Sequence, residues 1–288
     1  MNREDPFAMM ARFPQRYRPA NRPIHIFLRT MVILVEMVLQ PRHRLIGGRH
    51  LKAAQEVRDK GEGIVLDMDH WGWSDIVLPL GLFWWRGYRP LTQKLFFLIG
   101  MRWIEKFWVK FGDRSYIIPP VLWPEHPTDA QALQLARYAA EAFRINDDQL
   151  EAGKMTWAAS QGTRGRPPVA RPSDPPGIIA PERGAWRIWR RAAFVVPVAL
   201  EGTERITPVG TWFPRFWRPL KVIVGEPMPV QGRSPSSEQV AIARAMLHVE
   251  FGDPRYAGVY REVAERAVSE KRRAAVGQTA QGEAVARL

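Results

Sequence analysis

The sequence predicts an α/β fold: a single domain with a mixed, largely parallel central sheet flanked by helices. Short apolar runs typical of buried strands alternate along the chain with longer stretches that open on helix-capping residues. Of the 288 residues, 46% are hydrophobic and 25% are charged. This composition excludes wholesale disorder, and the length is sufficient to bury a substantial core. We expect an amphipathic N-terminal helix to precede the domain.

The first 48 residues are expected to form a basic leader with this helix. Residues 1–50 contain nine Arg and no Lys, against three acidic residues. Within 24–39, apolar side chains recur at spacings of three and four, with polar ones opposite. This stretch is too short and too charged to span a bilayer, which requires ~20 mostly apolar residues. The helix either lies in the plane of an anionic membrane surface or packs on the domain's own core.

Strands are predicted from apolar runs bounded by glycine, proline or charge. They cover residues 63–69, 116–118, 155–160, 193–200 and 220–224. Near-continuous hydrophobic runs of this kind are typical of strands buried on both faces.

Helices are predicted where a capping box opens an amphipathic stretch. Thr128 with Gln131 opens one that continues to about residue 145. Ser236 with Gln239 opens another that continues to about residue 251. Both boxes place a hydroxyl three residues before a glutamine, which satisfies the first backbone N–H groups of a helix.

Two further helices and the domain limits complete the assignment. One helix is predicted at 75–82 and another from about residue 258. The folded domain is expected to cover 49–275. The tail at 276–288 has neither aromatic residues nor a periodic pattern, and it is expected to be disordered.

Charge and the absence of cysteine limit the classes of function. The chain has 42 Lys and Arg against 29 Asp and Glu, a formal net charge of +13, which favours an anionic partner. It contains no Cys, which excludes disulfides, thiolate metal sites and a cysteine nucleophile.

Tryptophan is the unusual feature of the composition. All 12 Trp lie between Trp71 and Trp217. The aromatic stretch 76–111 is interrupted by Arg and Lys, so no part of it spans a bilayer. It is interpreted either as ordinary core or as the lining of an acyl channel or membrane interface. Nucleic acid binding is not expected, because the aromatics lie in apolar runs and not on alternating polar strands.

The strand at 63–69 leads directly into HWGWSD, which begins with His70 and ends with Asp75. At a strand-to-helix junction, a histidine and a carboxylate at this spacing can meet across the turn. The carboxylate then holds the imidazole in one tautomer and stabilises the imidazolium once a proton is taken. The pair is a candidate for activating a hydroxyl group. A structural role for a lone His70 is the alternative.

A second candidate follows the strand at 155–160. It is a glycine turn that consists of Gln161, Gly162, Thr163, Arg164, Gly165 and Arg166. Arginine forks bind phosphate oxygens with fixed geometry, and glycine lets the backbone approach closely. A solvated basic loop is the alternative. The third element, VVPVAL in the strand at 193–200, indicates by itself only a buried strand.

Taken in this order, the three elements resemble the lysophospholipid acyltransferase family. The family's His-x4-Asp box is matched by DHWGWSD, its Gly-Thr-Arg turn by AASQGTR and its Val-Pro-Val strand by VVPVAL. The resemblance covers residues 49–227. It implies acyl transfer from a thioester, either acyl-CoA or acyl carrier protein, to a hydroxyl of a lysophospholipid-type acceptor. It implies neither a metal nor a cofactor.

The resemblance also implies roles for residues. His70 would be the general base and Asp75 its orienting partner. The residues that would bind the acceptor are Gln161, Gly162, Thr163, Arg164 and Arg166, with Arg164 on its phosphate. The expected location is the cytoplasmic face of a membrane, as a monotopic or peripheral protein on its anionic surface.

Several positions depart from the family's pattern. Gln161 stands where the family has Glu, so the negative charge is lost. Asp69 stands for the usual Asn, which places a second carboxylate beside His70. The family's second motif has no clean match. Glu201-Gly202-Thr203 resembles the third motif, but Glu204 occupies the arginine position. The alternative function is a catalytically silent, basic membrane-surface binding protein of the same fold.

Overall fold

Most of the predicted domain is described in the structure, a computed structural model. The described residues are 42–71, 75, 78–88, 95–100, 115–118, 128–161, 175–181, 184–206, 208, 215, 217–230, 232 and 234–285. The amphipathic helix predicted at 24–39 lies outside them.

One sheet of eight strands forms the centre of the described part of the chain, in the order β1-β7-β6-β2-β5-β3-β4, and β8 pairs with β6. The strands are β1 (His43–Ile46), β2 (Ile64–Met68), β3 (Leu95–Gly100), β4 (Ser115–Ile118), β5 (Met155–Ala158), β6 (Phe194–Glu201), β7 (Leu220–Val224) and β8 (Met228–Pro229). From β6 through β2, β5 and β3 to β4, neighbouring strands are parallel. β7 and β8 run antiparallel to β6, and β1 runs parallel to β7. The predicted mixed, largely parallel sheet is confirmed.

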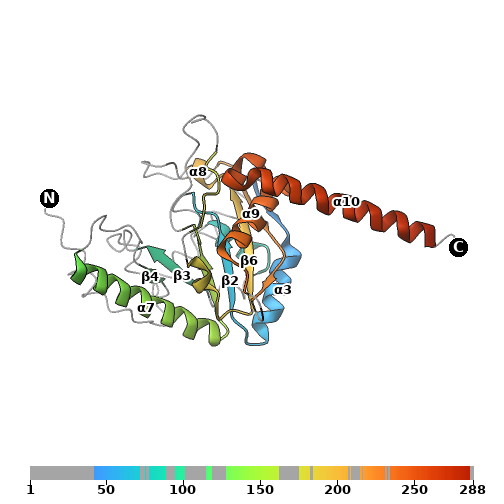
Figure 1. The fold of residues 1–288 in the computed structure, drawn as a ribbon. Helices are drawn as coiled ribbons and strands as arrows, with labels where there is room; N and C mark the ends of the chain where they lie inside the picture. The colour runs from blue at the N-terminus through green and yellow to red at the C-terminus, as the bar shows by residue number, and fades with distance from the viewer. Residues whose placement is uncertain are drawn as a thin grey trace.

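Helices flank this sheet (Figure 1). They are α3 (Gly48–Asp59), α4 (Leu78–Trp85), α7 (Asp129–Glu151), α8 (Thr203–Ile206), α9 (Ser237–Phe251) and α10 (Arg261–Val285), with the 3-10 turns η4 (Ala185–Ile188) and η5 (Pro254–Tyr260). α7 contacts β4 and β5, whereas α9 contacts β6 and β7. α10 packs on α9 and then extends away from the domain.

Alternating residues of the central strand β2 belong to different parts of the core. Ile64 and Leu66 pack with side chains of α3 and α4 in the larger hydrophobic cluster. Val65 packs in a second cluster with η4 and the end of α7. Because successive side chains of a strand point to opposite faces, Asp67 lies on the face of Val65. Arg244 of α9 is 3.4 Å from the Asp67 carboxylate there, so this face buries charged groups close to the strand's end.

Both predicted capping boxes are present. Gln131 N donates to Thr128 Oγ1 at 3.3 Å, and Thr128 N donates to Gln131 Oε1 at 3.0 Å. The corresponding distances between Ser236 and Gln239 are 3.1 and 2.8 Å. The local sequence therefore starts α7 and α9, the second of which reaches the candidate site.

The end of α7 differs from its prediction. The helix continues to Glu151, past the expected residue 145, because tertiary contacts extend it. Leu150 is buried in the core, and Asn146 Nδ2 donates to the carbonyl of Ile188 at 2.7 Å. Packing of this kind overrides local propensity.

The C-terminal segment also differs from its prediction. η5 occupies residues 254–260 and contains Gly258 at φ 59°, so α10 begins at Arg261 and not at 258. α10 then extends through Val285, so 276–285 is helical where a disordered tail was predicted.

Among the described strands and helices, β1, α3, β3, α8 and β8 were not predicted. β1 lies within the segment 1–48 that was assigned to the leader, so the sheet begins at His43. α4 begins at Leu78, later than the predicted residue 75. In the aromatic stretch, Phe83 is fully buried and its ring lies 5.7 Å from that of Trp157, as expected for ordinary core.

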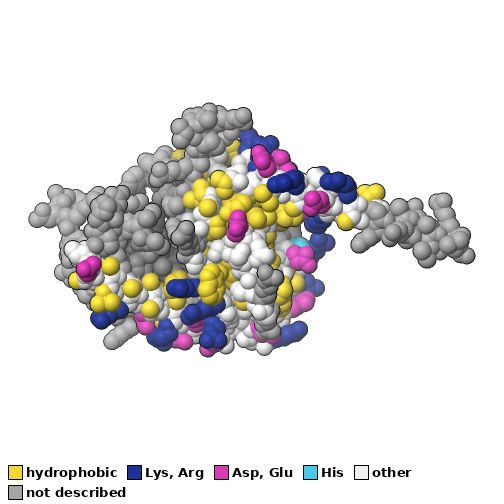
Figure 2. All heavy atoms as spheres, viewed as in Figure 1, with side chains coloured by type: hydrophobic (Ala, Val, Ile, Leu, Met, Phe, Trp, Pro, Cys, Tyr) yellow, Lys and Arg dark blue, Asp and Glu magenta, His cyan; other side chains and the backbone are white. Residues whose placement is uncertain are grey.

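The surface of the described part carries mixed charge. On the face drawn in Figure 2, basic and acidic side chains alternate along α10 and around α7, with hydrophobic side chains between them. Among the described residues, no helix combines the length and the apolar character needed to cross a bilayer.

Candidate active site

The motifs converge at one edge of the sheet. β2, β5 and β6 are parallel neighbours, so their carboxyl ends lie side by side. β2 leads into His70, and β5 leads into Gln161. β6 ends at Glu201. Ligand sites in open α/β sheets lie beyond the carboxyl ends of the strands, so this edge is the candidate active site.

His70 and Asp75 meet at this edge, as their spacing predicted. Nδ1 of His70 lies 3.0 Å from Oδ2 of Asp75. The side chain of Asp75 is fully buried, whereas that of His70 is 18% exposed. Since a carboxylate only accepts hydrogen bonds, the neutral imidazole carries its proton on Nδ1 and presents the lone pair of Nε2. This arrangement can take a proton from a hydroxyl group.

Trp71 fixes the chain immediately after His70. Its backbone N donates to Oδ2 of Asp75 at 2.5 Å, the same oxygen that faces the imidazole. Its indole Nε1 donates to the carbonyl of Leu200 in β6 at 2.6 Å. A carboxylate that accepts from two fixed donors has little freedom to turn, so Asp75 is held in position to orient His70.

Gln161, predicted to bind the acceptor, faces the histidine loop. It is 1% exposed, and its Nε2 donates to the backbone carbonyl of His70 at 3.1 Å. The side chain therefore links the ends of β5 and β2. Contact between Gln161 and an acceptor stays a prediction.

Asp69 does not lie beside His70 as a second carboxylate, and this prediction was wrong. Its side chain is buried and turns toward α9, where Oδ2 is 2.8 Å from Nε2 of His248. The same oxygen accepts from the backbone N of Leu200 at 2.9 Å. Successive residues of an extended chain point to opposite sides, so the side chains at 69 and 70 diverge.

Asp67 and Ser160 join the ends of β2 and β5 in the same buried layer. Ser160 donates to the Asp67 carboxylate from its backbone N at 2.8 Å and from Oγ at 2.9 Å. Arg244 of α9 lies against this carboxylate and donates to the backbone carbonyl of Met68. Burial raises the pKa of Asp67, although the charge of Arg244 and the bonds from Ser160 oppose the shift.

The sequence reasoning missed Arg244 and His248. They lie four residues apart on α9, so they share one helix face. Both are fully buried. A pair of basic side chains at this spacing inside an otherwise apolar helix face was the signal that could have identified them.

Glu201-Gly202-Thr203, the sequence that resembles the third motif, has a structural role here. Glu201 is buried and accepts from the backbone N of Asp253 at 2.7 Å. Its other oxygen lies 2.9 Å from Nζ of Lys221. The carboxylate thus joins β6, β7 and the end of α9.

The other predicted acceptor residues lie outside the described residues. They are Gly162, Thr163, Arg164 and Arg166. Their roles stay predictions.

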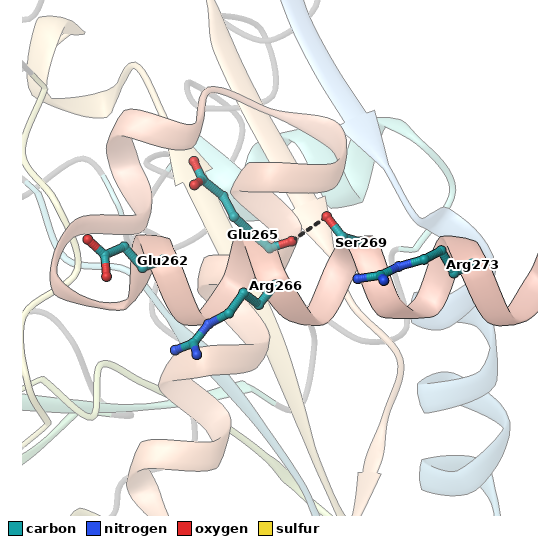
Figure 3. A pocket seen from close by; sticks show the side chains of 5 residues that line it. All are labelled: Glu262, Glu265, Arg266, Ser269 and Arg273. Atoms are coloured by element: carbon teal, nitrogen blue, oxygen red, sulfur yellow. Dashed lines mark hydrogen bonds between the residues drawn. The ribbon is translucent and has the colours of Figure 1, made fainter.

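The described residues contain no cluster of His, Asp and Glu arranged to hold a metal ion. A surface hollow on α10, drawn in Figure 3, is lined by Glu262, Glu265, Arg266, Ser269 and Arg273. All five belong to one helix, and the Ser269 hydroxyl donates to the backbone carbonyl of Glu265. The hollow contains no residue of the His70 site.

Comparison with known proteins identifies a shared fold. No model of a known protein family matches the chain, and no curated protein matches it. Among solved structures, the chain is similar to the 1-acyl-sn-glycerophosphate (LPA) acyltransferase from Thermotoga maritima. The two are 17% identical, with a TM-score of 0.50, over 85% of this chain and 78% of that chain. At this identity the similarity shows that the two chains share a fold.

Proposed function

We propose that this protein is an O-acyltransferase that moves a fatty acyl group from an acyl thioester to a hydroxyl of a lysophospholipid-type acceptor. The observation that carries the proposal is the contact between His70 and Asp75 at the carboxyl edge of the sheet. The fold shared with a 1-acyl-sn-glycerophosphate acyltransferase supports it, as does the order of the three motifs along the chain.

His70 is the general base in this proposal. Its Nε2 accepts the proton of the acceptor hydroxyl while the hydroxyl oxygen attacks the thioester carbonyl. The new C–O bond forms, the C–S bond breaks, and the imidazolium returns its proton to the departing thiolate. Asp75 stabilises the imidazolium between these steps through Nδ1. The acyl group passes directly from sulfur to oxygen, so the protein needs no nucleophile of its own.

The acceptor's phosphate is assigned to the loop after β5. Arg164 binds it as a bidentate partner, with Arg166 beside it; Gly162 lets the backbone approach closely, and Thr163 contributes to binding the acceptor. β5 ends next to β2, so this loop starts beside the strand that presents His70. The donor is acyl-CoA or acyl carrier protein.

In this proposal the membrane lies at the same edge of the sheet as His70. β1 runs parallel to β7, and β7 runs antiparallel to β6, so β1 begins where β6 ends. At this point Arg42 Nη1 donates to the backbone carbonyl of Trp217, whose side chain is exposed. A basic amphipathic leader in the plane of an anionic membrane therefore brings the His70 edge toward the bilayer. We propose that the protein works as a monotopic or peripheral protein on the cytoplasmic face.

The inward orientation of Gln161 favours one alternative, a catalytically silent membrane-surface binding protein of the same fold. An assay with anionic vesicles, a panel of lysophospholipids, and labelled acyl-CoA or acyl carrier protein separates the two functions. Transfer of label to one acceptor supports the enzyme. Vesicle binding without transfer for any pair of donor and acceptor supports the silent protein.

A further inference from the structure

A layer of charged side chains is buried between α9 and the ends of β2 and β6. It is formed by Asp67, Asp69, Glu201, Arg244 and His248. Buried charges are costly unless they are paired, so each member of such a layer constrains its neighbours. The layer lies directly behind the loop that carries His70.

His248 joins the end of β2 to the end of β6. Nε2 lies 2.8 Å from Oδ2 of Asp69 at the end of β2, and Nδ1 lies 2.9 Å from Oε1 of Glu201 at the end of β6. The ring of Tyr256 stacks on the imidazole, with centroids 5.4 Å apart and an interplanar angle of 17°. The imidazole is therefore held at both nitrogens and on one face.

Both nitrogens of His248 face carboxylates, so both carry protons. Burial by itself lowers the pKa of His248, but the carboxylates of Asp69 and Glu201 outweigh burial and raise it. The other charged groups at this point are Arg244, 3.7 Å from Asp69, and Lys221, 2.9 Å from Glu201. A cation between two carboxylates is the arrangement that satisfies all three groups.

The two neighbours of His70 are bonded to one residue of β6. Leu200 N donates to Asp69 Oδ2, and Leu200 O accepts from Trp71 Nε1. His70 thus lies between two residues that are both attached to Leu200. The hydrogen bond between Leu200 N and Asp69 depends on the orientation of the Asp69 carboxylate, which His248 maintains.

We infer that His248 is a positioning residue for His70. By bridging Asp69 and Glu201 it fixes the end of β2, and with it the direction of the imidazole that faces Asp75. The inference rests on the proposed function, in which His70 is the general base. It predicts that loss of the bridge moves His70, although His248 itself makes no contact with the substrate.

Two readouts on the full chain test this role. Nitrogen NMR of the imidazoles, with His70 assigned by its own substitution, reports the protonated Nδ1 that faces Asp75. Acyl transfer to the lysophospholipid that serves as acceptor separates kcat from KM. In His248→Gln we expect the His70 Nδ1–H signal to shift or broaden. We also expect kcat to fall by about tenfold to hundredfold with KM unchanged, because small misplacement of a reacting group has effects of this size.

Asn146→Ala is the matched control. Asn146 is also fully buried and makes two hydrogen bonds, to the carbonyl of Ile188 and from Thr156 Oγ1, and neither bond involves a residue of the His70 loop. It should lose stability and keep both the His70 signal and kcat. The double variant Asp69→Asn with His248→Gln replaces the ionic contact with a neutral amide pair, and it should recover most of both readouts.

Unchanged kcat and an unchanged His70 signal in His248→Gln, with stability lowered as in the control, would overturn the inference. A double variant no better than His248→Gln would also overturn it. If the wild type transfers no acyl group, the proposed function fails, and the His70 signal alone then decides whether His248 positions the imidazole. If His248→Gln does not fold, the His70 Nδ1–H signal and kcat are measured on the double variant.

Discussion

The side-chain amide of Gln161 donates to the backbone carbonyl of His70 at 3.1 Å, which ties the end of β5 to the end of β2. Gln161 occupies the position where the resembled family carries Glu. An ionised carboxylate could not donate to this carbonyl, whereas an amide can. The glutamine therefore braces the loop that presents the imidazole.

Replacing Gln161 with Met should lower the free energy of unfolding by about 1–3 kcal/mol, because the carbonyl of His70 loses its donor in a partly buried site. Urea denaturation measures the change. Gln149→Met is the matched control: Gln149 is half-buried at the far end of α7, where it accepts from Lys154. Its substitution should cost less than about 1 kcal/mol. Equal stability of Gln161→Met and the wild type would show that the bond contributes nothing.

The stability of the protein should depend on pH through His248. Its pKa is raised above the ordinary value of 6.5 in the folded protein, because the carboxylates of Asp69 and Glu201 outweigh burial. Protonation therefore favours folding. The contribution of His248 is full below pH 6.5 and is lost as the pH rises through the folded pKa.

The difference in unfolding free energy between the wild type and His248→Gln should consequently shrink as the pH rises above 6.5 and through the raised pKa of His248. The pKa of Glu201 is lowered from 4.5, since hydrogen bonds and the charge of His248 overcome its burial, so its own titration falls on the acid side of this range. Urea denaturation at a series of pH values provides the measurement. A difference that stays constant or grows with pH would refute the cationic bridge.

Deleting residues 2–41 should lower sedimentation with anionic vesicles and leave the domain folded. The deleted segment contains most of the Arg residues of the leader. It is followed by Arg42, which lies at the His70 edge of the sheet. Arg187→Gln with Arg191→Gln is the control, because η4 precedes β6 and so lies at the opposite edge. Binding that survives the deletion but is lost in the control would show that the membrane contacts the edge at η4 and not the His70 edge, which would contradict our account.

Local patterns were sufficient to predict much of the fold. The capping residues Thr128 and Ser236 start α7 and α9, and the apolar run at 220–224 is β7. These features depend on neighbouring residues alone. The spacing of His70 and Asp75 likewise predicted their contact, because five residues are enough to reverse the chain at the end of a strand.

Features that depend on distant residues were not predictable. Asp69 was expected beside His70, but its direction is set by His248, which lies 179 residues away along the chain. The hydrogen bond from Gln161 to the backbone carbonyl of His70, 91 residues away, was not predicted either. β1 was missed because its four residues become a strand only when β7 is beside them.

The central claim is that His70 removes the proton of the acceptor hydroxyl. The most direct test is the rate of acyl transfer by His70→Ala, measured with the donor and lysophospholipid that serve the wild type, on anionic vesicles. Loss of a general base lowers the rate by about 10²–10⁴-fold, and the account predicts a loss of this size while vesicle binding and folding are retained. Transfer by His70→Ala at the wild-type rate would contradict it.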